Sequence, residues 1–102
     1  MSTVAEKAII ERAGRALIKA VPSPAKVISV PSPGGLEYRF VVIEQDLPER
    51  HREMVRLSRI LGELLIPADV VVVSEVELNQ ERFQKGSFIH DALRSGEVIA
   101  ES

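Results

Sequence analysis

Hydrophobic and polar positions follow two different periods along this chain, and each period predicts one type of element. The first helix is predicted over residues 3–20, because apolar residues recur there every three or four positions between lysines and arginines. Ser2 or Thr3 can cap its first turn, and Glu6 stands three residues after Thr3, which is the capping-box spacing. A Pro-Ser-Pro segment then ends the helix.

Three short runs rich in β-branched residues predict strands, at residues 26–30, 37–43 and 70–73. Only the Pro- and Gly-rich turn 31–35 separates the first two strands, so we expect them to pair as antiparallel neighbours with no helix between them. A helix predicted over residues 46–65 separates the second strand from the third. This helix is long enough to return the chain for a parallel pairing.

The helix over 46–65 carries the clearest amphipathic pattern in the sequence. Asp46 is its candidate N-cap, and Pro48 stands where a first-turn proline belongs. One apolar stripe follows the helix, formed by Leu47, Met54, Leu57, Leu61, Leu64 and Leu65. This stripe predicts burial of one face of the helix against the sheet.

The last third of the chain predicts short elements. Ser74 caps a helix through about residue 83, with Glu77 at the capping-box position, and a last helix covers residues 88–94. Val98 and Ile99 form either a small terminal strand or an apolar tail. The order α-β-β-α-β-α-α predicts a single α/β (α+β) domain over residues 1–102, with a short mixed three-stranded sheet covered by helices.

Composition narrows the classes of function and location. The 102 residues carry a net charge of −2, which disfavours a nucleic-acid binder. The chain has no cysteine, which excludes disulfides and thiolate chemistry. No apolar run approaches the ~20 residues that span a membrane, and the first residues lack an apolar signal core. We therefore expect a cytoplasmic protein with no membrane contact.

Two segments of the second half resemble a known family. Residues 65–75 read LIPADVVVVSE, and residues 85–101 read KGSFIHDALRSGEVIAE. They resemble the minimal nucleotidyltransferases, the small prokaryotic members of the DNA polymerase β-like superfamily, which end in a PVDVVVV strand and an EALREGRVLYE segment. The resemblance covers nearly the whole chain, is strongest in these segments, and implies a nucleotidyltransferase-like fold.

The same resemblance implies where catalysis would be carried out, and this chain departs from the family there. In the family, a Gly-Ser loop and its helix cradle the triphosphate, and an Asp-x-Asp pair with a third aspartate holds two Mg²⁺ ions. Here the Gly-Ser position reads Pro31-Ser32 and the helix is missing. The Asp-x-Asp pair reads Glu37-Tyr-Arg39, and only Asp69 is unchanged.

These departures have physical consequences for a phosphate and metal site. Pro31 has no N–H to donate to a phosphate, and Arg39 brings a fixed positive charge to a position that requires a carboxylate. We therefore expect Arg39 to form a salt bridge with Glu37 or Asp69. Ser32, Glu37, Arg39 and Asp69 are remnants in this interpretation, and no catalytic residue, nucleotide-binding residue, metal or cofactor is assigned.

The favoured hypothesis is a degenerate, non-catalytic nucleotidyltransferase-like protein that acts through protein contacts. The resemblance implies a small helical HEPN protein as partner, with this chain in the antitoxin-like role, or else a homodimer. One alternative is an active Mg²⁺-dependent nucleotidyltransferase that transfers a nucleotide from ATP and uses Glu37, Asp69 and a further acid such as Glu44.

A second alternative is a nucleotide- or RNA-binding module without turnover. It depends on a basic stripe on the predicted helix, formed by Arg52, Arg56 and Arg59. Glu49, Glu53 and Glu63 lie close to this stripe in sequence. The stripe is therefore interpreted as a solvated helix face with local ion pairs, and nucleic acid is not an expected partner.

Overall fold

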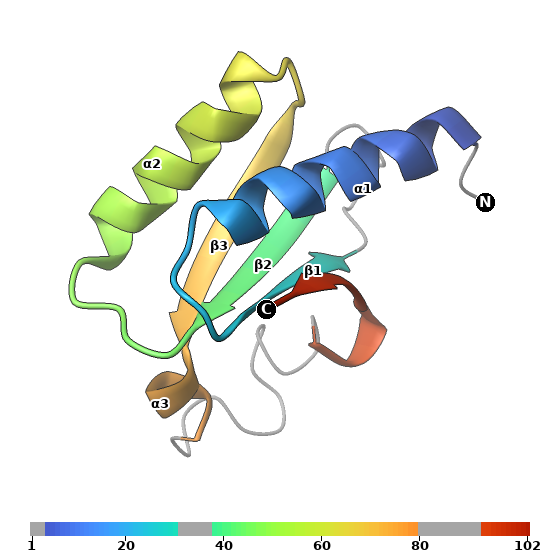
Figure 1. Cartoon of the computed structure of the whole chain (residues 1–102). Helices are drawn as coiled ribbons and strands as arrows, with labels where there is room; N and C mark the ends of the chain where they lie inside the picture. The colour runs from blue at the N-terminus through green and yellow to red at the C-terminus, as the bar shows by residue number, and fades with distance from the viewer. Residues whose placement is uncertain (1–3, 31–37, 80–92) are drawn as a thin grey trace.

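The structure is a computed structural model that describes residues 4–30, 38–79 and 93–102. It is an α+β domain with a mixed four-stranded sheet in the order β3-β2-β1-β4. Figure 1 shows α1 and α2 lying over the same face of this sheet. The elements in chain order are α1 (Val4–Lys19), β1 (Ala25–Val30), β2 (Tyr38–Glu44), α2 (Arg50–Glu63), β3 (Ala68–Ser74), α3 (Glu75–Leu78) and β4 (Glu97–Glu101).

The central pairings confirm the predicted directions. β1 and β2 are antiparallel, with Ala25 opposite Glu44 and Val30 opposite Arg39. β2 and β3 are parallel, and α2 provides the return connection between them. The prediction that no helix interrupts residues 31–36 lies outside the described residues.

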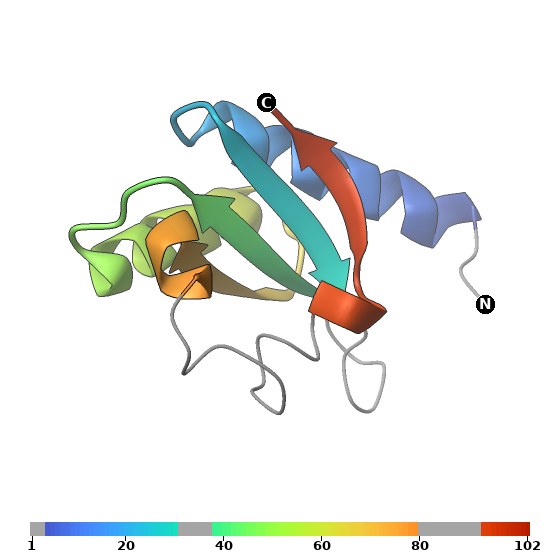
Figure 2. The same cartoon turned by 90° about the horizontal axis from the view of Figure 1, so that it is seen from below.

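The expected three-stranded sheet is wrong, because β4 adds a fourth strand. β4 pairs antiparallel with β1, with Lys26 opposite Glu101 and Ser29 opposite Glu97, and the register shifts between Val27 and Ile28. Figure 2 shows these two strands side by side. The segment that contains Val98 is therefore a strand, and a strand rather than a helix is the last element of the described order. The helix predicted over residues 88–94 lies largely outside the described residues.

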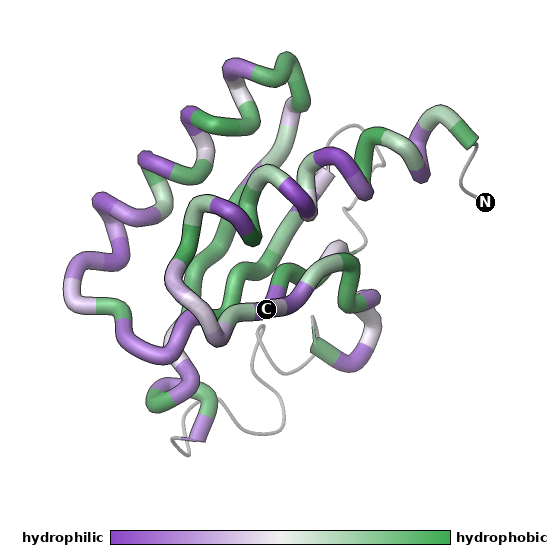
Figure 3. The backbone as a smooth tube through the Cα atoms, viewed as in Figure 1, coloured by the Kyte–Doolittle hydropathy of each residue, from purple (hydrophilic) through white to green (hydrophobic). Residues whose placement is uncertain are grey.

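The sheet separates two apolar clusters according to the alternation of side chains along each strand. Phe40 and Val42 face α1 and α2 in the larger cluster, together with Leu17, Leu57 and Leu61. The opposite face of the sheet carries a smaller cluster formed by Ile28, Val30, Val41, Ile43 and Val73. Hydrophobic and hydrophilic residues alternate along α1 and α2 in Figure 3, as expected for helices that cover a sheet with one side only.

The start of α2 differs from the prediction. The helix begins at Arg50, its N-cap is Glu49, and no side-chain hydrogen bond caps it. Asp46 is therefore not the cap, and Pro48 precedes the helix instead of lying in its first turn. A residue before proline is disfavoured in the helical conformation, so Leu47 stays outside the helix and packs its side chain against the core.

Candidate functional site

The first candidate site lies at the amino-terminal end of the parallel strand pair. Register places Arg39 of β2 opposite Asp69 of β3. The Arg39 Nη2 atom lies 3.6 Å from Asp69 Oδ2, and the Asp69 side chain is 59% exposed. This ion pair confirms the expected salt bridge of Arg39. Because the ion pair is exposed, it adds little to the stability of the fold. Its main consequence is the positive charge of Arg39 beside Asp69.

The described part of this site holds Asp69 beside Arg39. Two-metal transfer requires several carboxylates that converge on ions about 3.5–4 Å apart. Arg39 occupies the space beside Asp69 instead, and a guanidinium repels a divalent cation at that distance. Among the described residues, no group of three or more His, Cys, Asp or Glu side chains is arranged to hold a metal. Ser32 and Glu37 lie outside the described residues.

A groove of about 380 Å³ runs beside this ion pair along β3. Its floor is the start of β3, and Met54 and Ser58 of α2 form its other side. A second hollow of about 530 Å³ lies on the outer side of α2 and also includes Met54 and Ser58. Val55 lines this second hollow and is 45% exposed. The two hollows therefore form one largely apolar strip from the edge of β3 onto α2.

The arginine stripe of α2 is mostly engaged in local ion pairs. Arg52 Nη1 lies 3.2 Å from Glu49 Oε2, and Arg56 Nε lies 2.8 Å from Glu53 Oε1. Both pairs confirm the interpretation of a helix face with local ion pairs. Arg59 is exposed and lines the hollow on the outer side of α2.

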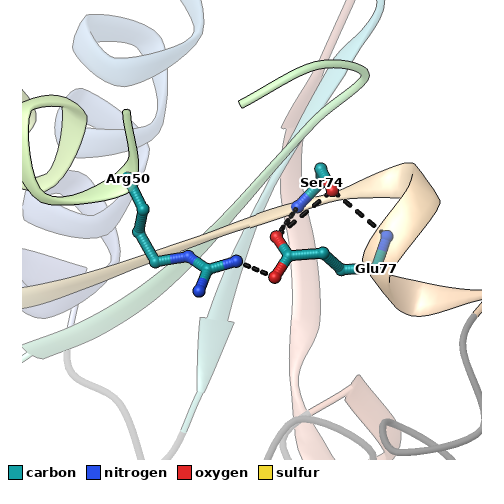
Figure 4. Close-up of polar contacts among 3 residues, drawn as sticks. All are labelled: Arg50, Ser74 and Glu77. Atoms are coloured by element: carbon teal, nitrogen blue, oxygen red, sulfur yellow. Dashed lines mark hydrogen bonds and ion pairs between the residues drawn. The ribbon is translucent and has the colours of Figure 1, made fainter. Parts of the chain in front are cut away.

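A polar junction joins α2 to the end of β3 (Figure 4). Ser74 Oγ accepts a hydrogen bond from the Glu77 N–H, and the Glu77 carboxylate accepts one from the Ser74 N–H, each at 3.1 Å. These bonds confirm the predicted capping box, although α3 ends at Leu78 instead of near residue 83. Glu77 also forms an ion pair with Arg50, which sequence reasoning did not anticipate.

Glu44 forms a second candidate site, at the carboxyl end of β2. The residue is only 4% exposed, and it lines a pocket of about 600 Å³ with Glu53 and Arg56. Burial, together with a hydrogen bond and charge repulsion from the neighbouring Glu53, raises the pKa of Glu44 to about 8. The Arg56 guanidinium lowers the pKa of Glu53 by a hydrogen bond. Glu44 is therefore held as the neutral acid beside an ionised Glu53.

In the sequence, Glu44 is only an additional acid of the enzyme alternative. The structure does not bring it to Asp69: Glu44 and Arg39 lie at opposite ends of β2, about 17 Å apart along the strand. The signal in the sequence is an acid that directly continues the run from Phe40 to Ile43. Such a position is typical of a strand that ends in solvent, so its burial could not be foreseen.

The sequence matches no protein-family model, and no curated protein matches it. None of the helices in the described ranges is long and apolar enough to cross a membrane.

Proposed function

We propose that this chain is a nucleotidyltransferase-like domain that has lost nucleotide transfer and acts in the cytoplasm through contacts with another protein. The observation that carries the proposal is the ion pair between Arg39 and Asp69 at 3.6 Å. In the family that the chain resembles, the corresponding positions carry two carboxylates for Mg²⁺. Here the positive charge of Arg39 offsets the negative charge of Asp69, the one aspartate that remains. The site therefore has less net negative charge to attract Mg²⁺.

The strip beside β3 supports a protein partner. β3 ends the described sheet on one side, and an edge strand offers backbone groups that can pair with another chain. The neighbouring groove and the exposed Val55 add apolar surface next to that edge. A small helical HEPN protein is the partner that the resemblance implies, and a second copy of this chain is the other occupant of this surface.

The catalytic half of the proposal is tested with labelled ATP and Mg²⁺, with and without any HEPN-like helical protein that a neighbouring gene encodes. We expect no label on either protein. Arg39→Asp is expected to remain inactive, because one added carboxylate does not restore the Gly-Ser loop and its helix. Transfer by the unmodified protein that is abolished by Asp69→Asn would show that the active site is intact.

The association half is tested by sedimentation of the purified chain, alone and mixed with the HEPN-like protein. We expect a dimer or a stable mixed complex. Val55→Asp should weaken that complex by tenfold or more, about 1.4 kcal/mol, because it buries a charge in the interface. Gln45→Asp places the same charge on an exposed position away from the strip and is the matched control. A chain that remains monomeric and binds no helical partner would contradict the proposal.

A further inference from the structure

The pocket beside Glu44 shares no lining residue with the groove along β3 or with the hollow on the outer side of α2. Along β2, Glu44 shares the face of Phe40 and Val42, below α2, whereas Arg39 belongs to the opposite face of the sheet. Glu44 is 4% exposed, and its Oε2 atom has no hydrogen-bond partner within the part of the chain described. A buried carboxyl oxygen without a donor is costly, so a ligand that supplies one gains affinity there.

The charges around this pocket favour a cation. Six ionisable side chains line it: the four acids Glu44, Asp46, Glu49 and Glu53, and the two arginines Arg52 and Arg56. Both guanidiniums already face acids, since Arg52 pairs with Glu49 at 3.2 Å and Arg56 pairs with Glu53 at 2.8 Å. Among the acids of this pocket, Glu44 and Asp46 are thus the two that form no ion pair with a cationic side chain of the described residues.

The remaining lining limits the shape of that cation. Pro22, Leu47 and Pro48 form the apolar part of the pocket wall. Such a surface accepts a hydrocarbon chain and offers no ligand to a metal ion. The described residues also contain no group of three or more acids or imidazoles arranged for a metal. An organic cation on an alkyl chain fits both the charge and the apolar wall.

We propose that this pocket binds an alkyl chain that ends in an ammonium or guanidinium group, with the Glu44 carboxylate as hydrogen-bond acceptor and the exposed Asp46 as a second negative charge. A lysine or arginine side chain of another protein and a free polyamine share this chemistry. The proposal does not depend on the proposed function, because the Arg39–Asp69 pair is about 17 Å away along β2.

The test is a titration of the full chain with n-butylguanidinium, followed by carboxyl-carbon NMR of Glu44 and by calorimetry in buffers of different ionisation enthalpy. Burial and the neighbouring Glu53 raise the pKa of Glu44 to about 8, so the group is protonated at pH 7 and must lose its proton when the cation binds. We expect saturable binding, proton release, and a fall in the pKa of Glu44 of about one unit or more. Tetramethylammonium has no N–H donor and should produce none of these effects.

Variants separate the pocket from general charge effects. Glu44→Gln keeps the shape of the side chain and should weaken n-butylguanidinium binding by about tenfold or more. Asp46→Asn should weaken it less, because Asp46 is exposed. Glu75→Gln removes an exposed acid of α3 outside the pocket and should leave binding unchanged. Unchanged binding by Glu44→Gln, or equal effects of tetramethylammonium, would overturn the proposal.

Two further ligands distinguish the sources of the cation. Nα-acetylarginine methylamide carries the side chain on a peptide backbone, and spermidine is a free polyamine. Tighter binding of Nα-acetylarginine methylamide identifies the ligand of the pocket as a side chain of a partner protein. Tighter binding of spermidine identifies the ligand as a polyamine. Either order supports the site, and saturable binding of neither compound to the unmodified chain would refute it.

Discussion

Replacing Glu44 with Gln is expected to stabilise the protein at pH 8 by about 3–5 kcal/mol, while changing little at pH 4.5. The pKa of Glu44 is raised from 4.5 to about 8 in the folded chain by burial and by Glu53. Between these two values the unfolded chain has released the proton and the folded chain still holds it. The free energy of unfolding therefore falls as pH rises from about 4.5 to 8. Glutamine stays neutral over this range, and its amide can donate to Glu53.

Urea unfolding at a series of pH values measures this effect. The unmodified chain should lose stability across the window, and Glu44→Gln should remove most of the slope. The pKa of Glu53 is lowered by Arg56, so the stability that Glu53 provides is lost only below pH 4.5, outside the window. Glu75→Gln is the exposed control and should keep the original slope. Parallel pH profiles of the unmodified chain and Glu44→Gln would show that Glu44 ionises normally in the folded protein.

Local patterns were sufficient to predict the centre of the fold. The runs that became β2 and β3 are apolar on both faces, and a sheet with helices on one side and a second cluster on the other buries such runs. The long amphipathic helix between them implied the parallel pairing that β2 and β3 make. The end of α1 was predicted to within one residue, because prolines interrupt the helical pattern there.

Local patterns were not sufficient to predict the fourth strand. β4 has only five residues, and none of them is fully buried, so its pattern fits a strand and a tail equally well. Its pairing with β1 joins segments about seventy residues apart in sequence. Such a pairing depends on long-range contacts, here between Ile99 and the larger core cluster. A single sequence gives little information about contacts of this kind.

The two candidate sites also differ in how far local sequence patterns predict them. Arg39 lies near the start of the strand predicted over residues 37–43, and Asp69 directly precedes the strand predicted over residues 70–73. With these strands parallel, the two residues lie opposite each other by register. The pocket of Glu44 is formed by the segment before α2, by the first turns of α2 and by Pro22 after α1. Two separate parts of the chain, residues 46–56 and Pro22, surround one carboxyl, so its burial is a property of tertiary structure that periodicity does not report.

Gly14→Leu is expected to destabilise the protein by about 2–3 kcal/mol, because α1 lies too close to β4 for a side chain at this position. A Cβ atom on Gly14 would lie 2.9 Å from Ile99 Cδ1 and 3.1 Å from Ile99 Cγ1. Ala100 Cβ would lie 3.6 Å away, so β4 offers no free space beside the helix. Leucine would either separate the two elements or displace Ile99 from the core.

A double-mutant cycle tests this close contact directly. Gly14→Ala alone should change stability little, because the crowding of Ile99 offsets the gain of about 1 kcal/mol from better helix propensity. After Ile99→Ala removes the crowding atoms, Gly14→Ala should stabilise the chain by about 1 kcal/mol. Gly62 of α2 is the matched control, since a Cβ there meets nothing within 4 Å. Gly62→Ala should thus stabilise both backgrounds equally, and an equal gain from Gly14→Ala in both would show that α1 does not pack against β4 in this way.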